Sequence, residues 1–368
     1  MEYKPIIKAL NSSGGEMSGA AGEKPAVESS ACAHPGIDWR NGILLRSTNW
    51  LGDALMTLPA AWQLSRLKPA PCGFFVLAPR ALAPLWRACP WVDVVIEMSG
   101  KRITRDEARE AGHLVPGVGV VFPNSFGAAF DLFRCGVPVR IGRRGRFRSL
   151  LLTHRLPEWK RTGGTAAFHQ LSWYLDLVAS LGKVEMSTGY PPLNTDASLA
   201  REAGISCGDN WLAIAPGAAY GPAKQWPREH FLEVARWHVA NGGRIVLVGT
   251  GREAPVTSWL AEQLPHCLDL AGKTSLSVLM SVLAACRAVV ANDSGAMHLA
   301  AAVGTRGVAV FGSTDPVATG PVGAPWRILA SKEPCRPCFR RECVHGDYRC
   351  LKGIRPESVI AELRHIVE

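Results

Sequence analysis

The chain has 368 residues, of which 47% are hydrophobic and 20% are charged, and its formal net charge is +10. This length is enough for two domains of roughly 150 residues each, and this composition excludes a chain that is disordered over most of its length. Apolar runs stay shorter than the roughly 18 residues that a membrane-spanning helix needs. The first 40 residues also contain no apolar block of signal-peptide length, so we expect a cytoplasmic protein.

The positive charge is concentrated in one region. Residues 134–161 contain nine lysines and arginines and one acidic residue, Glu158, which leaves +8 of the net charge there. Such a run suits an anionic partner, although a merely solvated surface explains it equally well. Few aromatic residues interrupt the run, and no platform for stacking bases is evident, so we expect no nucleic-acid partner.

Composition separates the N-terminus from the rest of the chain. Residues 1–40 are rich in Gly, Ser and Ala without hydrophobic periodicity, which predicts a flexible leader. From residue 41 onward, short apolar runs alternate with longer amphipathic stretches. This alternation is typical of βαβ units around a parallel sheet and predicts an α/β fold.

Two such series follow one another along the chain. In a first domain, residues 41–187, we predict four strands and three helices: strands 42–46, 74–78, 93–97 and 119–122, and helices 53–66, 125–134 and 166–181. Residues 188–210 are rich in turn formers and are interpreted as a linker. In a second domain, residues 211–368, we predict strands 211–215, 244–248, 288–291 and 308–311, helices 228–240, 275–285 and 295–303, and a C-terminal helix. Parallel sheets bind ligands beyond the carboxyl ends of their strands, so we expect the site in a cleft between the two domains.

Asp53 lies where the first strand ends in a polar turn and a helix begins. An aspartate there often caps the helix. The alternative is a catalytic base, because the positive end of the helix dipole favours an ionised carboxylate that can accept a proton.

Two polar segments of the second domain indicate an anion site. Lys224 stands in a Gly- and Pro-rich loop after strand 211–215, where its ammonium could neutralise a diphosphate; an exposed lysine without a role is the alternative. Strand 288–291 runs into Asp293-Ser294-Gly295 and a helix whose first free N–H groups can bind an anion. His298, one turn into that helix, could add a donor, or could be a buried structural histidine.

Three further patterns in the predicted second domain resemble known binding motifs. Residues 271–274 end like a phosphate-binding P-loop, but Cys267 occupies the position of its first glycine, so that interpretation fails. Residues 249–254 fit the G-x-G-x-x-A pattern of dinucleotide-binding oxidoreductases, which leaves such an enzyme as an alternative. Near the end, four cysteines lie within 16 residues: Cys335, Cys338, Cys343 and Cys350. The first pair has the C-x-x-C spacing of a structural zinc site, whereas the second pair is irregularly spaced and also allows unmetallated thiols.

Five motifs together resemble the lipopolysaccharide heptosyltransferases of glycosyltransferase family nine. They are N-W-L-G-D-A-L-M-T-L-P (49–59), F-P-N-S-F (122–126), P-G-A-A-Y-G-P-A-K-Q-W-P (216–227), N-D-S-G-A-M-H (292–298) and F-G-S-T-D-P (311–316). The segment C-R-P-C-F-R-R-E-C (335–343) is similar to the type II branch of this family. The resemblance covers nearly the whole chain after the leader.

The resemblance implies a GT-B fold, in which two Rossmann-like domains face each other. It also implies inverting transfer of heptose from ADP-heptose to the heptose-bearing inner core of lipopolysaccharide, at the inner membrane and without a catalytic cofactor. By matching position, Asp53 would be the base and Lys224 would contact the diphosphate, while Glu253 would hold the ribose. Asp293, Ser294, Gly295 and His298 would line the phosphate site. Ala219 departs from the pattern, since some relatives carry a hydroxyl residue there.

The basic run then gains an interpretation. Arg143, Arg144, Arg146 and Arg148 lie in the acceptor half and are predicted to bind the phosphates and carboxylates of the lipopolysaccharide core. Two alternatives remain open: another nucleotide-sugar transferase of the same fold, and a basic binding protein without catalytic activity.

Overall fold

The computed structural model of the protein describes residues 37, 39, 41–158, 169–182, 189–323 and 325–367. Most of the predicted leader and part of the segment 159–188 lie outside these residues. Ile37 and Trp39, near the end of the predicted leader, are buried in the hydrophobic core. The chain therefore joins the folded core a few residues before residue 41.

The first domain is built on a six-stranded sheet with the order β3-β2-β1-β4-β5-β6. All neighbouring strands are parallel. The strands are β1 (Ile43–Arg46), β2 (Phe74–Pro79), β3 (Val94–Met98), β4 (Val118–Val121), β5 (Val139–Arg143) and β6 (His154–Leu156). The helices are α2 (Leu51–Ser65), α3 (Ala83–Arg87), α4 (Arg105–His113), α5 (Phe126–Arg134) and α6 (Leu171–Ala179), with 3-10 turns η1 (Arg80–Leu82) and η2 (Arg148–Leu150).

The second domain repeats this topology in a sheet of order β12-β11-β10-β7-β8-β9, again parallel throughout. Its strands are β7 (Trp211–Ala215), β8 (Arg244–Leu247), β9 (Leu268–Asp269), β10 (Ala288–Asn292), β11 (Gly307–Phe311) and β12 (Trp326–Ala330). Its helices are α8 (Arg228–Ala240), α9 (Ala254–Gln263), α10 (Leu276–Ala285), α11 (Gly295–Ala302), α12 (Pro316–Thr319), α13 (Arg349–Lys352) and α14 (Pro356–Val367), with the 3-10 turn η3 (Pro222–Lys224). Helix α7 (Ala197–Glu202) falls within the predicted linker and packs against α10.

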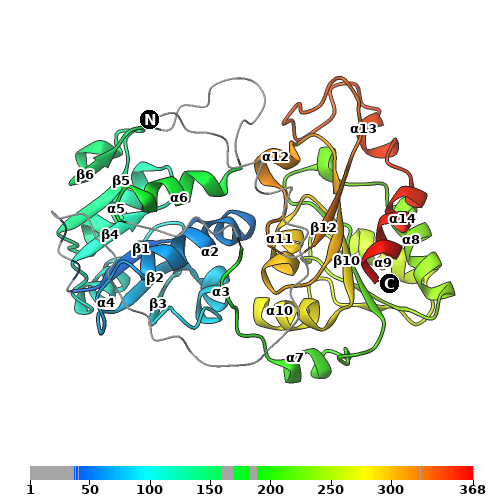
Figure 1. Ribbon diagram of the computed structural model, residues 1–368, viewed down its shortest axis with the longest axis horizontal. Coiled ribbons are helices and arrows are strands. Elements are labelled where there is room, and N and C mark those ends of the chain that lie inside the picture. Colours follow the sequence, from blue (N-terminus) through cyan, green and yellow to red (C-terminus); the bar gives the residue numbers. More distant parts are fainter. Residues whose placement is uncertain are drawn as a thin grey trace.

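The central strands are apolar along their whole length. Every residue of β1, β4, β7, β10 and β11 is buried, as expected for parallel strands whose two faces are both covered by helices. The α/β prediction is confirmed, and the expected strands agree with the observed ones within a few residues. The two sheets form two lobes, between which α2 and α3 of the first domain lie against α11 and α10 of the second (Figure 1).

Strands β5 and β6 were not predicted, although both lie within the basic run. In V-R-I-G-R the apolar residues Val139 and Ile141 alternate with arginines, and the charge hid this period of two. Across the described residues, no helix has both the length and the apolar character needed to cross a bilayer.

Candidate active site

A cavity of about 1340 Å³ lies between the two domains, at the carboxyl ends of both sheets. This volume exceeds the roughly 300–1,000 Å³ of a typical small-molecule site, so it can hold two substrates side by side. Asp53 and Gln170 line it from the first domain, whereas Lys224, Glu253 and Asp293 line it from the second. The predicted interdomain position of the site is therefore what the structure shows.

Asp53 lies in the first turn of α2, but it does not cap the helix. The capping position is Trp50, which makes no side-chain capping bond. The carboxylate of Asp53 instead accepts a hydrogen bond from Gln170 Nε2 at 3.1 Å. Burial raises the pKa of this carboxyl, while the Gln170 hydrogen bond and the charge of Lys224 lower it. The capping interpretation is thus replaced by a half-buried carboxylate that faces the cavity.

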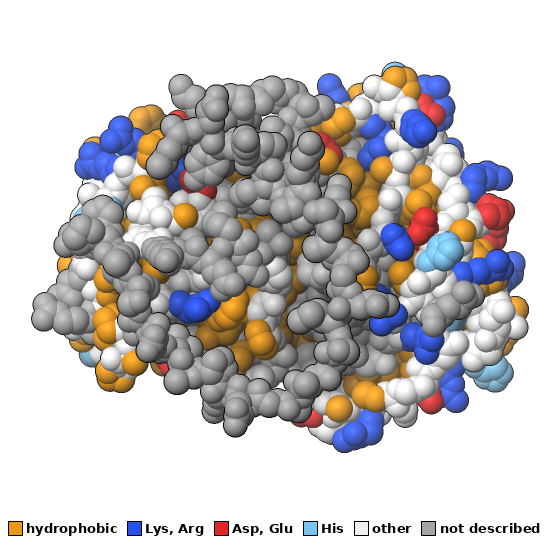
Figure 2. Space-filling view, viewed as in Figure 1, with side chains coloured by type: hydrophobic (Ala, Val, Ile, Leu, Met, Phe, Trp, Pro, Cys, Tyr) orange, Lys and Arg blue, Asp and Glu red, His pale blue; other side chains and the backbone are white. Residues whose placement is uncertain are grey.

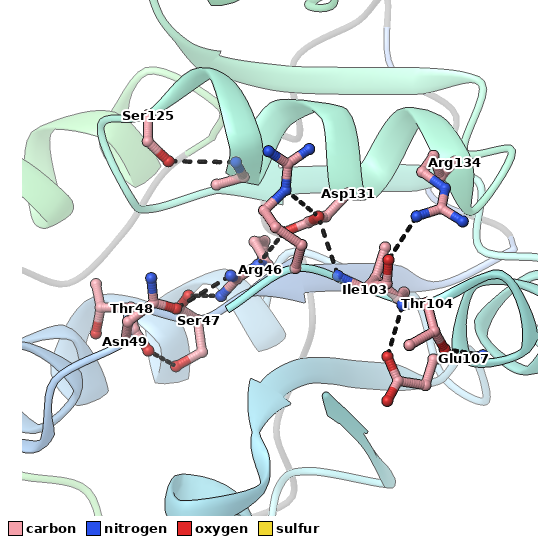
Figure 3. A network of polar contacts seen from close by, with 12 residues as sticks. Arg46, Ser47, Thr48, Asn49, Ile103, Thr104, Glu107, Ser125, Asp131 and Arg134 are labelled. Atoms are coloured by element: carbon pink, nitrogen blue, oxygen red, sulfur yellow. Dashed lines mark hydrogen bonds and ion pairs between the residues drawn. The ribbon is translucent and has the colours of Figure 1, made fainter. Parts of the chain in front are cut away.

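A buried ion pair fixes the turn that carries Asp53 (Figure 3). Arg46, the last residue of β1, donates from Nε to Asp131 of α5 at 2.9 Å, and both side chains are almost fully buried. Arg46 Nη2 also donates to Asn49 Oδ1 at 3.0 Å, and Trp86 Nε1 donates to Ser47 Oγ at 2.9 Å. These bonds tie residues 46–49 to α3 and α5, so the start of α2 is held in position.

Lys224 lines the cavity from the second domain. Its Nζ forms an ion pair with Asp293 Oδ2 at 2.6 Å and lies 4.8 Å from the centre of the Tyr220 ring. Thr314 Oγ1 donates to the same Asp293 oxygen at 2.6 Å. The Lys224 ammonium is therefore held where β10 gives way to α11, and the interpretation as an exposed lysine without a role is wrong.

The N-terminus of α11 opens into the cavity. Gly295 packs close to Leu51 of α2, so the first turns of these two helices are in contact beside the cavity. Burial lowers the pKa of His298 to about 4, which leaves its ring neutral at neutral pH. Ser294 Oγ and His298 Nδ1 are buried and have no hydrogen-bond partner among the described residues. Buried polar atoms are normally paired, so these two are suited to a polar ligand at the helix N-terminus.

Glu253 occupies a tight niche between two glycines. Its Oε2 accepts bonds from Thr250 N at 2.6 Å and Thr250 Oγ1 at 3.1 Å. A Cβ at Gly217 would collide with Glu253 Oε1, and one at Gly249 would lie 3.0 Å from Oε2. The two glycines thus leave room for a carboxylate at the cavity wall, where it can accept hydrogen bonds from a sugar.

Comparison with known proteins adds to this geometry. Residues 117–349, more than half of the chain, match the family model described as "Glycosyltransferase family 9 (heptosyltransferase)". The chain belongs to glycosyltransferase family 9. It is 27% identical to lipooligosaccharide heptosyltransferase 2 of Haemophilus influenzae, over 88% of this chain and 99% of that protein. Lipopolysaccharide heptosyltransferase 2 of Escherichia coli K12 is 28% identical, over 88% and 98%. The solved structure of E. coli ADP-heptose LPS heptosyltransferase II aligns with a TM-score of 0.75 over 88% of this chain and 98% of that one.

The four arginines predicted from the sequence to bind the acceptor differ from one another in solvent exposure in this member of glycosyltransferase family 9. Arg148 is buried and donates to Pro123 O at 2.8 Å, and Arg143 forms an ion pair with Asp176 of α6. Both side chains support the first domain from within. Arg144 and Arg146 are exposed, so their guanidinium groups are the accessible ones of the four.

The four cysteines near the C-terminus lie in or close to a segment that contributes Phe339 and Arg341 to the cavity lining. Burial raises the pKa of Cys350, and the neighbouring thiols of Cys335, Cys338 and Cys343 raise it further. No group of three or more His, Cys, Asp or Glu side chains suited to a metal ion occurs in the part of the chain that the structure describes. The structural-zinc hypothesis therefore gains no support here.

Several cavity residues of this family 9 protein were not singled out from the sequence. Gln170 reaches Asp53 from a segment more than 100 residues away, and Arg341 lies 5.4 Å from the Tyr220 ring, measured from its Cζ. Tyr220 itself donates to Phe339 O at 2.6 Å. Tyr220 and Arg341 lie within motifs recognised in the sequence, 216–227 and 335–343, whereas Gln170 has no local pattern that could have marked it.

Proposed function

We propose that this protein is an inverting glycosyltransferase that moves L-glycero-D-manno-heptose from ADP-heptose to the heptose-bearing inner core of lipopolysaccharide. One observation carries the proposal: a half-buried carboxylate from the first domain, Asp53, and the polar groups of Lys224 and Ser294 from the second domain line one cavity. Inverting transfer needs a base on the face of the sugar opposite the leaving group, and two facing domains supply this arrangement. The names of the relatives agree with heptose transfer to this acceptor, and the name of the solved E. coli enzyme includes ADP-heptose.

In the proposed reaction, Asp53 takes the proton of the acceptor hydroxyl as its oxygen forms a bond to the anomeric carbon. The bond from that carbon to the diphosphate oxygen breaks, and the electron pair leaves with ADP. Negative charge then grows on the diphosphate, where the Lys224 ammonium and the free N–H groups of α11 stabilise it. Ser294 and neutral His298 offer their unpaired polar atoms to the same phosphates, and Asp293 orients Lys224. Glu253 accepts hydrogen bonds from the ribose.

On the acceptor side, we assign contacts with core phosphates to Arg144 and Arg146, supported by Arg143 and Arg148. Because the acceptor is attached to a lipid, the protein works at the cytoplasmic side of the inner membrane, as a peripheral protein.

The test is incubation with ADP-heptose and a core acceptor that ends in a single heptose, followed by the mass and anomeric configuration of the product. We expect one added heptose with inverted configuration. Asp53→Asn should abolish transfer and leave ADP-heptose affinity within a few fold, whereas Asp106→Asn, an exposed aspartate on α4, should behave like the unchanged protein. Full turnover by Asp53→Asn, or a product with retained configuration, would contradict the proposal.

We propose further that transfer needs no catalytic cation, because Lys224 and α11 already place positive charge at the diphosphate. Transfer should therefore continue undiminished in excess EDTA. A structural zinc at Cys335, Cys338, Cys343 and Cys350 stays a separate prediction, which elemental analysis of the purified protein would decide.

A further inference from the structure

Helix α5 carries a stripe of phenylalanines on its outer side. Phe126, Phe130 and Phe133 follow the i, i+4, i+7 spacing of one helix face. The ring centres of Phe126 and Phe130 lie 6.1 Å apart, and those of Phe130 and Phe133 lie 6.0 Å apart. Phe126 is 42% exposed and Phe133 is 50% exposed. An amphipathic helix on a protein surface normally turns polar side chains outward, so packing within the domain does not account for this stripe.

The turn between β5 and β6 extends the same surface. Phe147 and Leu150 are 86% and 82% exposed, the highest values among the large hydrophobic residues that the structure describes. This turn packs against α5 through η2. The buried Arg148 side chain donates to Pro123 O and Arg144 O. These bonds hold the turn in position, while Phe147 and Leu150 are exposed to solvent.

Arginines surround these apolar side chains. Arg102 Cζ lies 5.3 Å from the centre of the Phe130 ring, and Arg140 Cζ lies 5.4 Å from that of Phe133. Arg144 and Arg146, both exposed, flank the Phe147 tip. In the space-filling view, basic and hydrophobic side chains gather at the end of the molecule where β5, β6 and α5 lie (Figure 2). We call this surface the aromatic–arginine face: Arg102, Phe126, Phe130, Phe133, Arg144, Arg146, Phe147 and Leu150.

We propose that the aromatic–arginine face docks the protein on an anionic bilayer. Exposed aromatic and aliphatic side chains enter the headgroup region, while arginines bind the lipid phosphates and extend their charge to the interface. The charge excess of residues 134–161 complements such a surface. A nucleic-acid partner is disfavoured because the α5 rings stack on one another and beneath arginines, which leaves their faces closed to bases.

The position of this face relative to the site supports the proposal. Asp53 follows β1, Phe126 follows β4, and Phe147 follows β5. Neighbouring parallel strands end at the same edge of a sheet, so docking would bring the acceptor side of the cavity toward the bilayer. This step rests on the proposed function, in which the acceptor is held in the membrane by its lipid.

The test measures sedimentation of the full chain with vesicles of phosphatidylethanolamine and phosphatidylglycerol at low salt, with no acceptor present. We expect binding that falls as salt rises and is absent with neutral phosphatidylcholine. Arg144→Ala with Arg146→Ala should weaken binding about 25-fold, since each basic residue near an anionic surface is worth about fivefold. Phe147→Ser with Leu150→Ser should weaken it by about tenfold or more.

Matched controls use exposed residues elsewhere in the structure. Val115→Ser with Val239→Ser and Arg201→Ala with Arg236→Ala should leave vesicle binding unchanged. The proposal would be overturned if the protein bound neutral vesicles as well as anionic ones, or if the control variants lost as much binding as the test variants. Absence of binding to any vesicle would also overturn it, and is what we expect of a surface that serves a soluble protein partner.

Activity separates this inference from the proposed function. With a short, delipidated acceptor, Phe147→Ser with Leu150→Ser should transfer heptose at the unchanged rate, whereas with acceptor embedded in anionic vesicles the rate should fall about tenfold. Transfer by this variant at full rate on both acceptors would overturn the docking role alone. Absence of transfer by the unchanged protein on either acceptor would instead contradict the proposed function.

Discussion

Asp53 is a carboxylate whose surroundings act in opposite directions. Burial raises the pKa of its side chain, whereas the hydrogen bond from Gln170 and the positive charge of Lys224 lower it. A base with a moderately raised pKa accepts a proton more readily, provided that it is still ionised at the working pH. Gln170 therefore both orients the carboxylate and lowers its pKa.

Replacing Gln170 by alanine removes this hydrogen bond and should raise the pKa of Asp53. Since the ionised form is the base, activity is lost as pH falls through that pKa, and the acidic limb of the kcat profile should move to higher pH. We expect kcat at neutral pH to fall about tenfold, the cost of one hydrogen bond to a charged group of about 1.5 kcal/mol. The measurement is kcat and KM from pH 5 to 9.

Gln263→Ala, on the exposed end of α9, is the control and should keep the profile of the unchanged protein. Gln170→Asn offers a shorter amide and should recover part of the rate. A Gln170→Ala enzyme with the same acidic limb and the same kcat would show that the hydrogen bond does not act on the base.

At the scale of an element, the ion pair of Arg46 and Asp131 joins β1 to α5. Asp131 also accepts bonds from Arg102 Nε at 3.2 Å and from Ile103 N at 3.3 Å. One carboxylate thus holds the strand that leads to Asp53, the helix of the aromatic–arginine face, and the segment before α4. Its buried partner Arg46 would be left with an uncompensated charge if the carboxylate were removed.

Asp131→Ala should therefore lower the free energy of unfolding of the first domain by about 3–5 kcal/mol. Urea-induced unfolding followed by circular dichroism measures this change. The exposed pair of Arg109 and Asp106 on α4 supplies the comparison: Asp106→Ala should change the free energy of unfolding by less than about 1 kcal/mol. Equal effects of the two substitutions would contradict the role assigned to the buried pair.

Arg336, in the segment that follows β12, is a second side chain that joins separate elements of the fold. Its guanidinium donates to Gly312 O, to Ser331 O at 2.6 Å, and to Thr314 O at 2.9 Å. Because Thr314 in turn bonds to Asp293, this side chain supports the position of the donor-binding groups. Arg336 binds backbone carbonyls next to the site and is not among the residues that line the cavity.

Arg336→Ala should raise KM for ADP-heptose about tenfold, since it leaves several carbonyls without a donor, and should change kcat little. Steady-state kinetics with varied donor and saturating acceptor give this split. Arg340→Ala, in the same segment but exposed, should leave both constants unchanged. A fall in kcat at constant KM would contradict a purely supporting role for Arg336.

What could be predicted from the sequence depended on how local each signal was. Apolar strands such as β7 and β10 and the motifs around Asp53, Lys224 and Asp293 were predictable because each is a short, contiguous pattern. Strand β5 was missed because arginines interrupt its period of two. Gln170 could not be found because its partner Asp53 is 117 residues away, and only the folded arrangement of two domains brings them together. The buried roles of Arg143 and Arg148 were hidden for the same reason.

At the scale of the whole molecule, His169 and Gln170 each form a hydrogen bond from the first domain to the second beside the cavity. His169 Nε2 lies 2.8 Å from Gly320 O, and Gln170 N donates to Ala318 O at 2.8 Å. His169 Nδ1 accepts from Leu171 N at 3.1 Å, so its proton is on Nε2, which donates to the second domain. Burial lowers the pKa of His169, so the ring stays neutral and keeps this arrangement at neutral pH.

Removing the His169 side chain should therefore act on the spacing of the domains. In His169→Ala we expect KM for both substrates to rise several fold, because the two domains together form the walls of the cavity in which both are proposed to bind. We also expect the radius of gyration in solution scattering to increase. His365→Ala, exposed on α14, should match the unchanged protein in both measurements. Saturating ADP-heptose should restore the compact form of His169→Ala, since a ligand bound in a cavity that both domains line favours the closed arrangement by its differential affinity. A variant that is expanded and yet has unchanged KM for both substrates would show that the two domains bind their substrates independently of this contact.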